Sequence, residues 1–159
     1  MTNFSLSSKV DDFIKEHKPS IAILAPSLDT IPSRHGNAIY CLIEDIACYS
    51  SYPVLVFSKY EEGLPESKIE DRIIYYTKPF KKTLFQKLIG YRGRKMFYGV
   101  SGTEDIAYSR QVYRFCLRNN IKCLVVEDSN SLLAGLPRSP KIKIILHQHI
   151  NALLFHNRY

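Results

Sequence analysis

The clearest structural signal in the sequence lies in residues 20–58, SIAILAPSLDTIPSRHGNAIYCLIEDIACYSSYPVLVFS. An apolar run that Pro26 ends is followed by a loop containing Gly36, and the segment closes on a second apolar run. Short continuous apolar runs are typical of strands covered on both faces. Between the runs, apolar residues recur at helical spacing after Asn37, a favourable N-cap residue: Ile39, Leu42, Ile43 and Ile46. The segment predicts a strand, a helix and a second strand parallel to the first.

The rest of the chain repeats this alternation. Three further apolar runs, at residues 72–77, 122–127 and 142–147, predict strands. A capping-box pattern at Ser101 and Glu104 predicts a helix that ends near Asn119. A short helix is expected over residues 10–16, and a single helical turn within residues 131–140. Alternating strands and helices predict an α/β fold, a Rossmann-like open, mainly parallel sheet with helices on both faces.

The length of 159 residues suits one domain with a sizeable core. We assign residues 20–159 to that domain and residues 1–19 to a polar N-terminal lead-in. The four cysteines form no C-x-x-C pair, and we expect four buried thiols in a reducing cytoplasm. The sequence contains no G-x-G-x-x-G and no G-x-x-x-x-G-K-[ST] motif, which argues against dinucleotide and P-loop binding.

Positive charge is concentrated in residues 78–100, which we call the basic segment. This segment holds seven of the 22 basic residues and none of the 15 acidic residues, so the whole net charge of +7 lies there. A helical apolar face over residues 80–89, flanked by Lys82 and Lys87, suits a membrane surface. Two alternatives are phosphate contacts to nucleic acid, and a helix that packs its apolar face on the sheet and solvates its lysines.

Polar side chains follow three of the predicted strands. In an open parallel sheet, ligands collect at the carboxyl ends of the strands, which nominates the loop through Gly36 and residues 127–130 and 147–151. His147 and His149 point the same way in an extended chain, and they suit a ligand contact, a structural hydrogen bond or, with a third ligand, a metal. The adjacent carboxylates Glu127 and Asp128 suit ligand hydroxyls, a base, or a cap on the next turn.

Two pairs of segments carry a resemblance to a known family. The order SIAILAP, RHGNAIYCLIEDIA and YPVLVFS, and later KCLVVEDSN and PKIKIILHQHIN, resembles the N-terminal, acceptor-side domain of glycosyltransferase family four, GT-B fold enzymes, over residues 20–151. Bacterial surface-polysaccharide sugar transferases are especially similar. The sequence departs from the family in two ways. His35 precedes Gly36 where many members have two adjacent glycines, and the donor domain with its paired glutamates is absent from this chain.

The resemblance implies a retaining glycosyltransferase that moves a sugar from a nucleotide-sugar to a polysaccharide or lipid-linked acceptor. Such enzymes need no metal and no cofactor, since the nucleotide-diphosphate sugar is a co-substrate. His147 would be the catalytic residue that contacts the donor sugar. The other donor-binding residues would be Gly36, His149 and Asn151.

The resemblance also implies an acceptor side and a membrane side. The acceptor would be bound by Glu127, Asp128, Arg92, Arg94 and Lys95. An anionic membrane surface would be met by Lys81, Lys82, Phe85 and Lys87. The chain would be cytoplasmic and peripheral on the inner face of the membrane. It would be inactive alone and would need a C-terminal donor domain, in the full-length enzyme or as a separate chain. The alternative function is a non-enzymatic α/β binding module whose basic segment binds nucleic acid.

Overall fold

The computed structural model describes residues 8–26, 31, 38–58, 67–77, 103–127 and 129–148. Four helices lie in this part of the chain: α1 (Ser8–His17), α2 (Ala38–Cys48), α5 (Thr103–Arg118) and α6 (Asn130–Leu133). It also contains six strands: β1 (Ile21–Leu24), β2 (Val54–Phe57), β3 (Ser67–Glu70), β4 (Ile73–Tyr76), β5 (Cys123–Glu127) and β6 (Lys143–His147). The basic segment lies outside the described residues, so its predicted helix stays a prediction.

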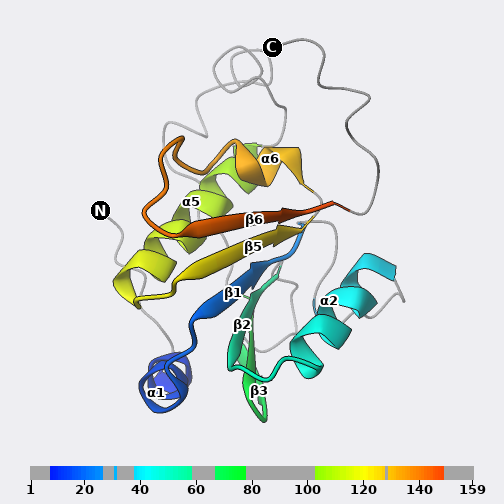
Figure 1. The fold of residues 1–159 in the computed structure, drawn as a ribbon, viewed down its shortest axis with the longest axis vertical. Helices are drawn as coiled ribbons and strands as arrows, with labels where there is room; N and C mark the ends of the chain where they lie inside the picture. The colour runs from blue at the N-terminus through cyan, green and yellow to red at the C-terminus, as the bar shows by residue number, and fades with distance from the viewer. Residues whose placement is uncertain are drawn as a thin grey trace.

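The strands form one sheet in the order β3-β4-β2-β1-β5-β6 (Figure 1). Every neighbouring pair is parallel except β3 with β4, which is antiparallel. The chain lays strands outward from β1 to β2 and β4, and α5 then returns it to β5 on the other side of β1. The direction of strand addition therefore reverses between β1 and β5, which is the topological switch point of an open α/β sheet.

Both faces of the sheet carry helices, as the sequence predicted. On one face α1 and α5 pack on side chains from four strands, and Val10, Val112 and Phe115 lie fully or almost fully buried there. On the other face α2 contributes Tyr40, Ile43 and Ala47 to a second buried cluster. Figure 1 shows α2 and α5 on opposite sides of the sheet. The sheet is thus the middle layer of three, and its central strands are buried on both faces.

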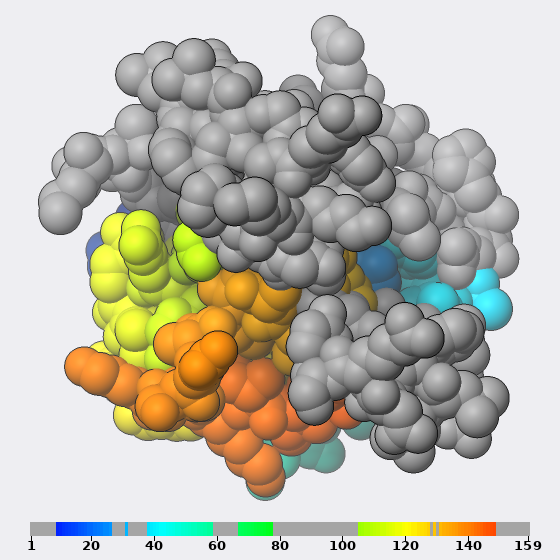
Figure 2. Space-filling model, turned by 90° about the horizontal axis from the view of Figure 1, so that it is seen from above, coloured from blue at the N-terminus to red at the C-terminus, as the bar shows by residue number. Residues whose placement is uncertain are grey.

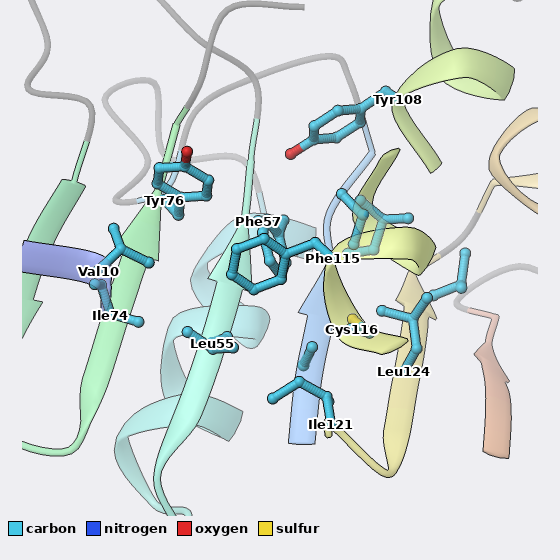
Figure 3. Packing of buried hydrophobic residues seen from close by; sticks show 14 of the residues in the cluster. Val10, Leu55, Phe57, Ile74, Tyr76, Tyr108, Phe115, Cys116, Ile121 and Leu124 are labelled. Carbon is cyan, nitrogen blue, oxygen red and sulfur yellow. The ribbon is translucent and has the colours of Figure 1, made fainter. Parts of the chain in front are cut away.

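Aromatic rings fill the centre of the layer beneath α5. The ring of Phe57 on β2 lies 5.3 Å from that of Phe115 and 5.8 Å from that of Tyr76, both edge to face. Figure 3 shows this group between the strands and α5, with Tyr76 and Tyr108 toward the end to which the strand arrows point. Edge-to-face aromatic pairs each contribute about 0.5–1.5 kcal/mol beyond their buried area. The rings thus fix the position of α5 over the sheet.

The junction of α5 and α6 is held by a close backbone approach. A Cβ atom at Gly135 would collide with Ser109 Oγ and with the carbonyl of Ile106, so only glycine fits this position beside α5. The guanidinium Nε of Arg110 donates to the Gly135 carbonyl at 3.3 Å. The backbone N–H of Lys141 donates to Tyr113 Oη at 2.8 Å. These contacts tie the connection between β5 and β6 to α5.

All five predicted strands are confirmed, and the sheet has one strand that the sequence did not predict. β3 has the sequence SKIE, with Ile69 as its one apolar residue, and it lies at the edge of the sheet. Its short length and its Lys68–Glu70 ion pair are typical of a protected edge strand.

The buried face of α2 differs from the apolar face that the sequence predicted. The buried residues of α2 are Tyr40, Ile43 and Ala47, whereas Leu42 and Ile46 are 38% and 39% exposed. The expectation of four buried thiols is wrong for the same reason. Cys41 and Cys48 lie on the exposed side of α2, Cys116 is buried in α5, and Cys123 is half-buried.

Candidate functional site

The adjacent ends of β5 and β6 carry the ionisable groups of the candidate site. Glu127 is the last residue of β5 and His147 the last residue of β6. The parallel ladder pairs the two residues directly, as the last step of a register that runs from Cys123 and Lys143. Their side chains therefore leave neighbouring strands at the same height. We call the side of the sheet at which the parallel strands end the carboxyl edge.

The side chains of the pair are in contact. His147 Nδ1 lies 3.0 Å from Glu127 Oε2. The Glu127 side chain is 0% exposed, and that of His147 is 42% exposed. A carboxylate removed from water is stable only when polar or charged groups replace its hydration. The imidazole supplies such a group, and its side chain is partly exposed. The Glu127–His147 pair therefore links the interior of the sheet to solvent.

Glu127 also borders the switch point. β5 pairs with β1 on its other side, and Leu24 at the end of β1 stands opposite Val126. Ligands of open α/β sheets bind outside the carboxyl ends of the strands where the strand order reverses. The Glu127–His147 pair thus lies where the topology of the sheet favours a ligand.

Two hydroxyl groups hold the chain where it leaves β1. Tyr40 Oη on α2 donates to the Pro26 carbonyl at 3.0 Å. The Ile31 N–H donates to Ser58 Oγ, which follows β2, at 3.2 Å. These bonds fix two points of the connection from β1 to α2, on either side of residues 27–30. They place the start of the loop that contains Gly36, although Gly36 itself lies outside the described residues.

A buried phenol supports the same edge from the opposite face. Tyr108 Oη on α5 donates to the Ser58 carbonyl at 2.9 Å. Burial, with a smaller contribution from Tyr76, raises the pKa of Tyr108 well above its ordinary value. Burial also raises the pKa of Cys116 to about 12. The phenol therefore stays a hydrogen-bond donor and the thiol stays protonated at neutral pH, so both groups are structural rather than reactive.

A polar network lies immediately after Glu127. Ser129 Oγ accepts from the Leu132 N–H at 3.2 Å and so caps α6. Ser131 Oγ donates to Asp105 Oδ2 at 2.5 Å and lies 3.0 Å from Ser129 Oγ. The network joins α6 to the first turn of α5. Ser129 thus caps the turn for which Glu127 or Asp128 was predicted as a cap, and Asp128 lies outside the described residues.

The structure brings together two of the predicted site residues, Glu127 and His147. Glu127 was predicted to face the acceptor and His147 the donor sugar, and the structure places their side chains in contact. The remaining site predictions lie outside the described residues: Gly36, Asp128, His149, Asn151, Arg92, Arg94, Lys95, Lys81, Lys82, Phe85 and Lys87.

The described side chains indicate which chemistry the site can support. An exposed imidazole backed by a buried carboxylate can bind hydroxyl groups and exchange protons with a ligand. In the part of the chain that the structure describes, no group of three or more His, Cys, Asp or Glu residues is arranged to hold a metal ion. Across those same residues, no helix has the length and apolar character needed to cross a membrane.

Comparisons with protein-family models, with curated proteins and with solved structures found no match to this chain.

Proposed function

We propose that this chain is the acceptor-side lobe of a retaining sugar transferase of the GT-B type, which uses a nucleotide-sugar and a polysaccharide or lipid-linked acceptor. The observation that carries the proposal is the contact of Glu127 with His147 at the carboxyl edge, beside the switch point. An exposed imidazole and nearby strand-end backbone groups suit a neutral, hydroxyl-rich ligand better than a purely apolar one.

The proposal divides the reaction between two lobes. This lobe would offer His147 to the transferred sugar and residues near Glu127 to the acceptor. A donor lobe, in the same enzyme or in a separate chain, would hold the nucleotide. Developing negative charge on the leaving diphosphate would be stabilised by basic side chains and helix N-termini, chemistry that requires no metal. The loop containing Gly36 would approach the diphosphate with its backbone.

The basic segment has a place in the same proposal. It follows β4, whose last residue lies at the carboxyl edge. A lipid-linked acceptor presents its reacting group at a membrane surface, and each Lys or Arg near an anionic surface contributes about 1 kcal/mol to binding. A charged segment joined to this edge would hold the acceptor site at the membrane and keep the chain peripheral on its inner face.

Sugar binding tests the site. In two-dimensional ¹H–¹⁵N NMR, UDP-glucose, GDP-mannose or their free sugars should move the backbone signals of Glu127 and His147. The shifts should be lost in His147→Ala, because the imidazole supplies the contact. His17→Ala is the matched control, since His17 ends α1 just before the amino end of β1. Shifts that persist in His147→Ala, or no shifts at this edge with any of these sugars, would refute the sugar site.

Vesicle binding tests the membrane part of the proposal. Replacing the seven basic residues of the basic segment with Gln should abolish co-sedimentation with vesicles containing phosphatidylserine, and the unmodified chain should not sediment with neutral vesicles. Equal sedimentation before and after the replacement would contradict the membrane role. Tight, salt-sensitive binding to oligonucleotides without vesicle binding would favour the nucleic-acid module instead.

A further inference from the structure

The Glu127–His147 contact specifies more than a shared location. The oxygen Oε2 of Glu127 lies 3.0 Å from one particular ring nitrogen, Nδ1 of His147. An ionised carboxylate can only accept hydrogen bonds. When the Glu127 carboxylate is ionised, a contact at this distance places the hydrogen on Nδ1. A neutral imidazole has a single N–H group, so the second nitrogen, Nε2, is then left with a lone pair.

We propose that Glu127 is a positioning residue that holds the neutral ring of His147 in the Nδ1–H tautomer, so that Nε2 accepts a hydrogen bond from a sugar hydroxyl. The tautomer follows from the contact between the two side chains. Its use toward a sugar rests on the proposed function. The two statements therefore stand on separate observations and are tested separately.

The backbone makes Glu127 a fixed reference for the ring. β5 is paired on both sides, with β1 and with β6, and the Glu127 side chain is fully buried. The carboxylate consequently has few alternative positions. His147 lies on the outermost parallel strand with a side chain that is 42% exposed, so its ring is the part of the pair that has freedom to lose. Contact with a fixed acceptor removes that freedom and sets the direction of Nε2.

The tautomer selects the chemical class of the ligand group. In the neutral ring, an Nε2 without hydrogen accepts from O–H and N–H donors, whereas phosphate oxygens are acceptors and gain nothing from it. The pair would therefore contact a hydroxyl of the sugar rather than the diphosphate of the donor. The carboxylate behind the ring would also stabilise the positive charge if Nε2 took a proton from that hydroxyl, as a buried carboxylate does for a catalytic histidine in hydrolases.

The ring tautomer can be measured without any ligand. In long-range ¹H–¹⁵N NMR of the uniformly labelled chain, the two ring nitrogens of His147 have distinct shifts, and loss of the signals in His147→Gln assigns them. In the neutral form of the ring, we expect hydrogen on Nδ1 and none on Nε2. Isolated histidine prefers the opposite tautomer in water, so a neutral ring with hydrogen on Nε2 would overturn the proposal.

A variant of Glu127 tests the cause. Glu127→Leu removes every acceptor and should return the neutral ring to the Nε2–H tautomer. Glu70→Leu is the matched control, because Glu70 lies on β3 at the far edge of the sheet and should leave the tautomer unchanged. An Nδ1–H tautomer that survives in a folded Glu127→Leu variant would contradict the proposal. If this variant does not fold, the tautomer measured in the unaltered chain still tests the proposal.

Ligand binding separates this inference from the proposed function. If Nε2 accepts a sugar hydroxyl, a saturating sugar should shift the ¹⁵N resonance of Nε2 and leave that of Nδ1 in place. A correct tautomer with no response to any sugar would refute the sugar assignment and leave the positioning role of Glu127 intact. A sugar response from a ring in the Nε2–H tautomer would refute the positioning role and leave the sugar site intact.

Discussion

Among single residues, Tyr108 shows how burial couples this fold to pH. Its hydroxyl donates to the Ser58 carbonyl, and burial raises the pKa of the phenol above its ordinary value of about 10. The folded chain therefore keeps the proton at a pH where the unfolded chain has released it. The stabilisation is complete below about pH 10 and is lost as the pH rises further, because the unfolded state then binds fewer protons.

We therefore expect the free energy of unfolding to fall steeply in alkaline solution, and Tyr108→Phe to make the fall shallower. The variant should also lose about 1 kcal/mol at neutral pH, since the Ser58 carbonyl loses its donor. Urea unfolding followed by circular dichroism between pH 7 and pH 11 measures both effects. Tyr49→Phe is the control, because Tyr49 is 88% exposed. An identical alkaline slope in Tyr108→Phe and in the unaltered chain would contradict the argument.

At the scale of the elements, the end of α1 stores a small strain. Lys18 follows α1, donates its N–H to the Ile14 carbonyl at 3.0 Å, and has a φ of 46°. A residue with a Cβ costs about 1–2 kcal/mol in this left-handed conformation, and glycine avoids most of that cost. Asn120 takes the same conformation after α5, with a φ of 56°.

Lys18→Gly should accordingly stabilise the chain by about 0.5–1 kcal/mol, after allowance for the greater freedom of glycine in the unfolded state. The thermal midpoint should rise by roughly 1–4 °C. Lys15→Gly, inside α1, is the control and should destabilise by about 1 kcal/mol. Scanning calorimetry compares the three chains, and a lowered midpoint in Lys18→Gly would show that the side chain of Lys18 outweighs the strain.

The elements also show what the sequence can specify. Runs such as IAIL and VLVF predict strands because only a strand buried on both faces needs every side chain apolar. β3 was not predicted because SKIE places one isolated isoleucine among polar residues. Its strand conformation depends on its pairing with β4, which the local sequence does not show. The buried face of α2 was not predicted correctly because Ile and Leu suit a core wherever they occur in a helix. In the structure, Tyr40 and Ala47 face the sheet instead of Leu42 and Ile46.

The candidate site was predictable only in part. The strand-end rule located Glu127 and His147 on one edge, since both end an apolar run in a parallel sheet. Their direct contact depends on the register between β5 and β6, which the intervening chain does not encode in any periodic pattern. The support from Tyr108 and Ser58 involves residues 50 positions apart, a tertiary contact that local patterns cannot specify.

For the molecule as a whole, the sheet order predicts where the structure is most resistant to opening. β1, β2 and β5 are paired on both sides and lie between helical layers, whereas β3 and β6 are edge strands with half-exposed side chains. Native-state hydrogen exchange should be slowest in β1 and β2 and faster by about tenfold or more in β3 and β6. Equal protection across all six strands would mean that the sheet opens only by global unfolding.

An exposed turn lies on the side of the sheet opposite the carboxyl edge. The turn at residues 137–140 is exposed, and it leads into the amino end of β6, where the Lys143 N–H donates to the Lys122 carbonyl. Figure 2 shows the orange stretch around this turn at the surface. A dye or a tether attached there would sit a full strand length from His147. The protein could then be immobilised on a sensor with the carboxyl edge turned toward the flowing solution.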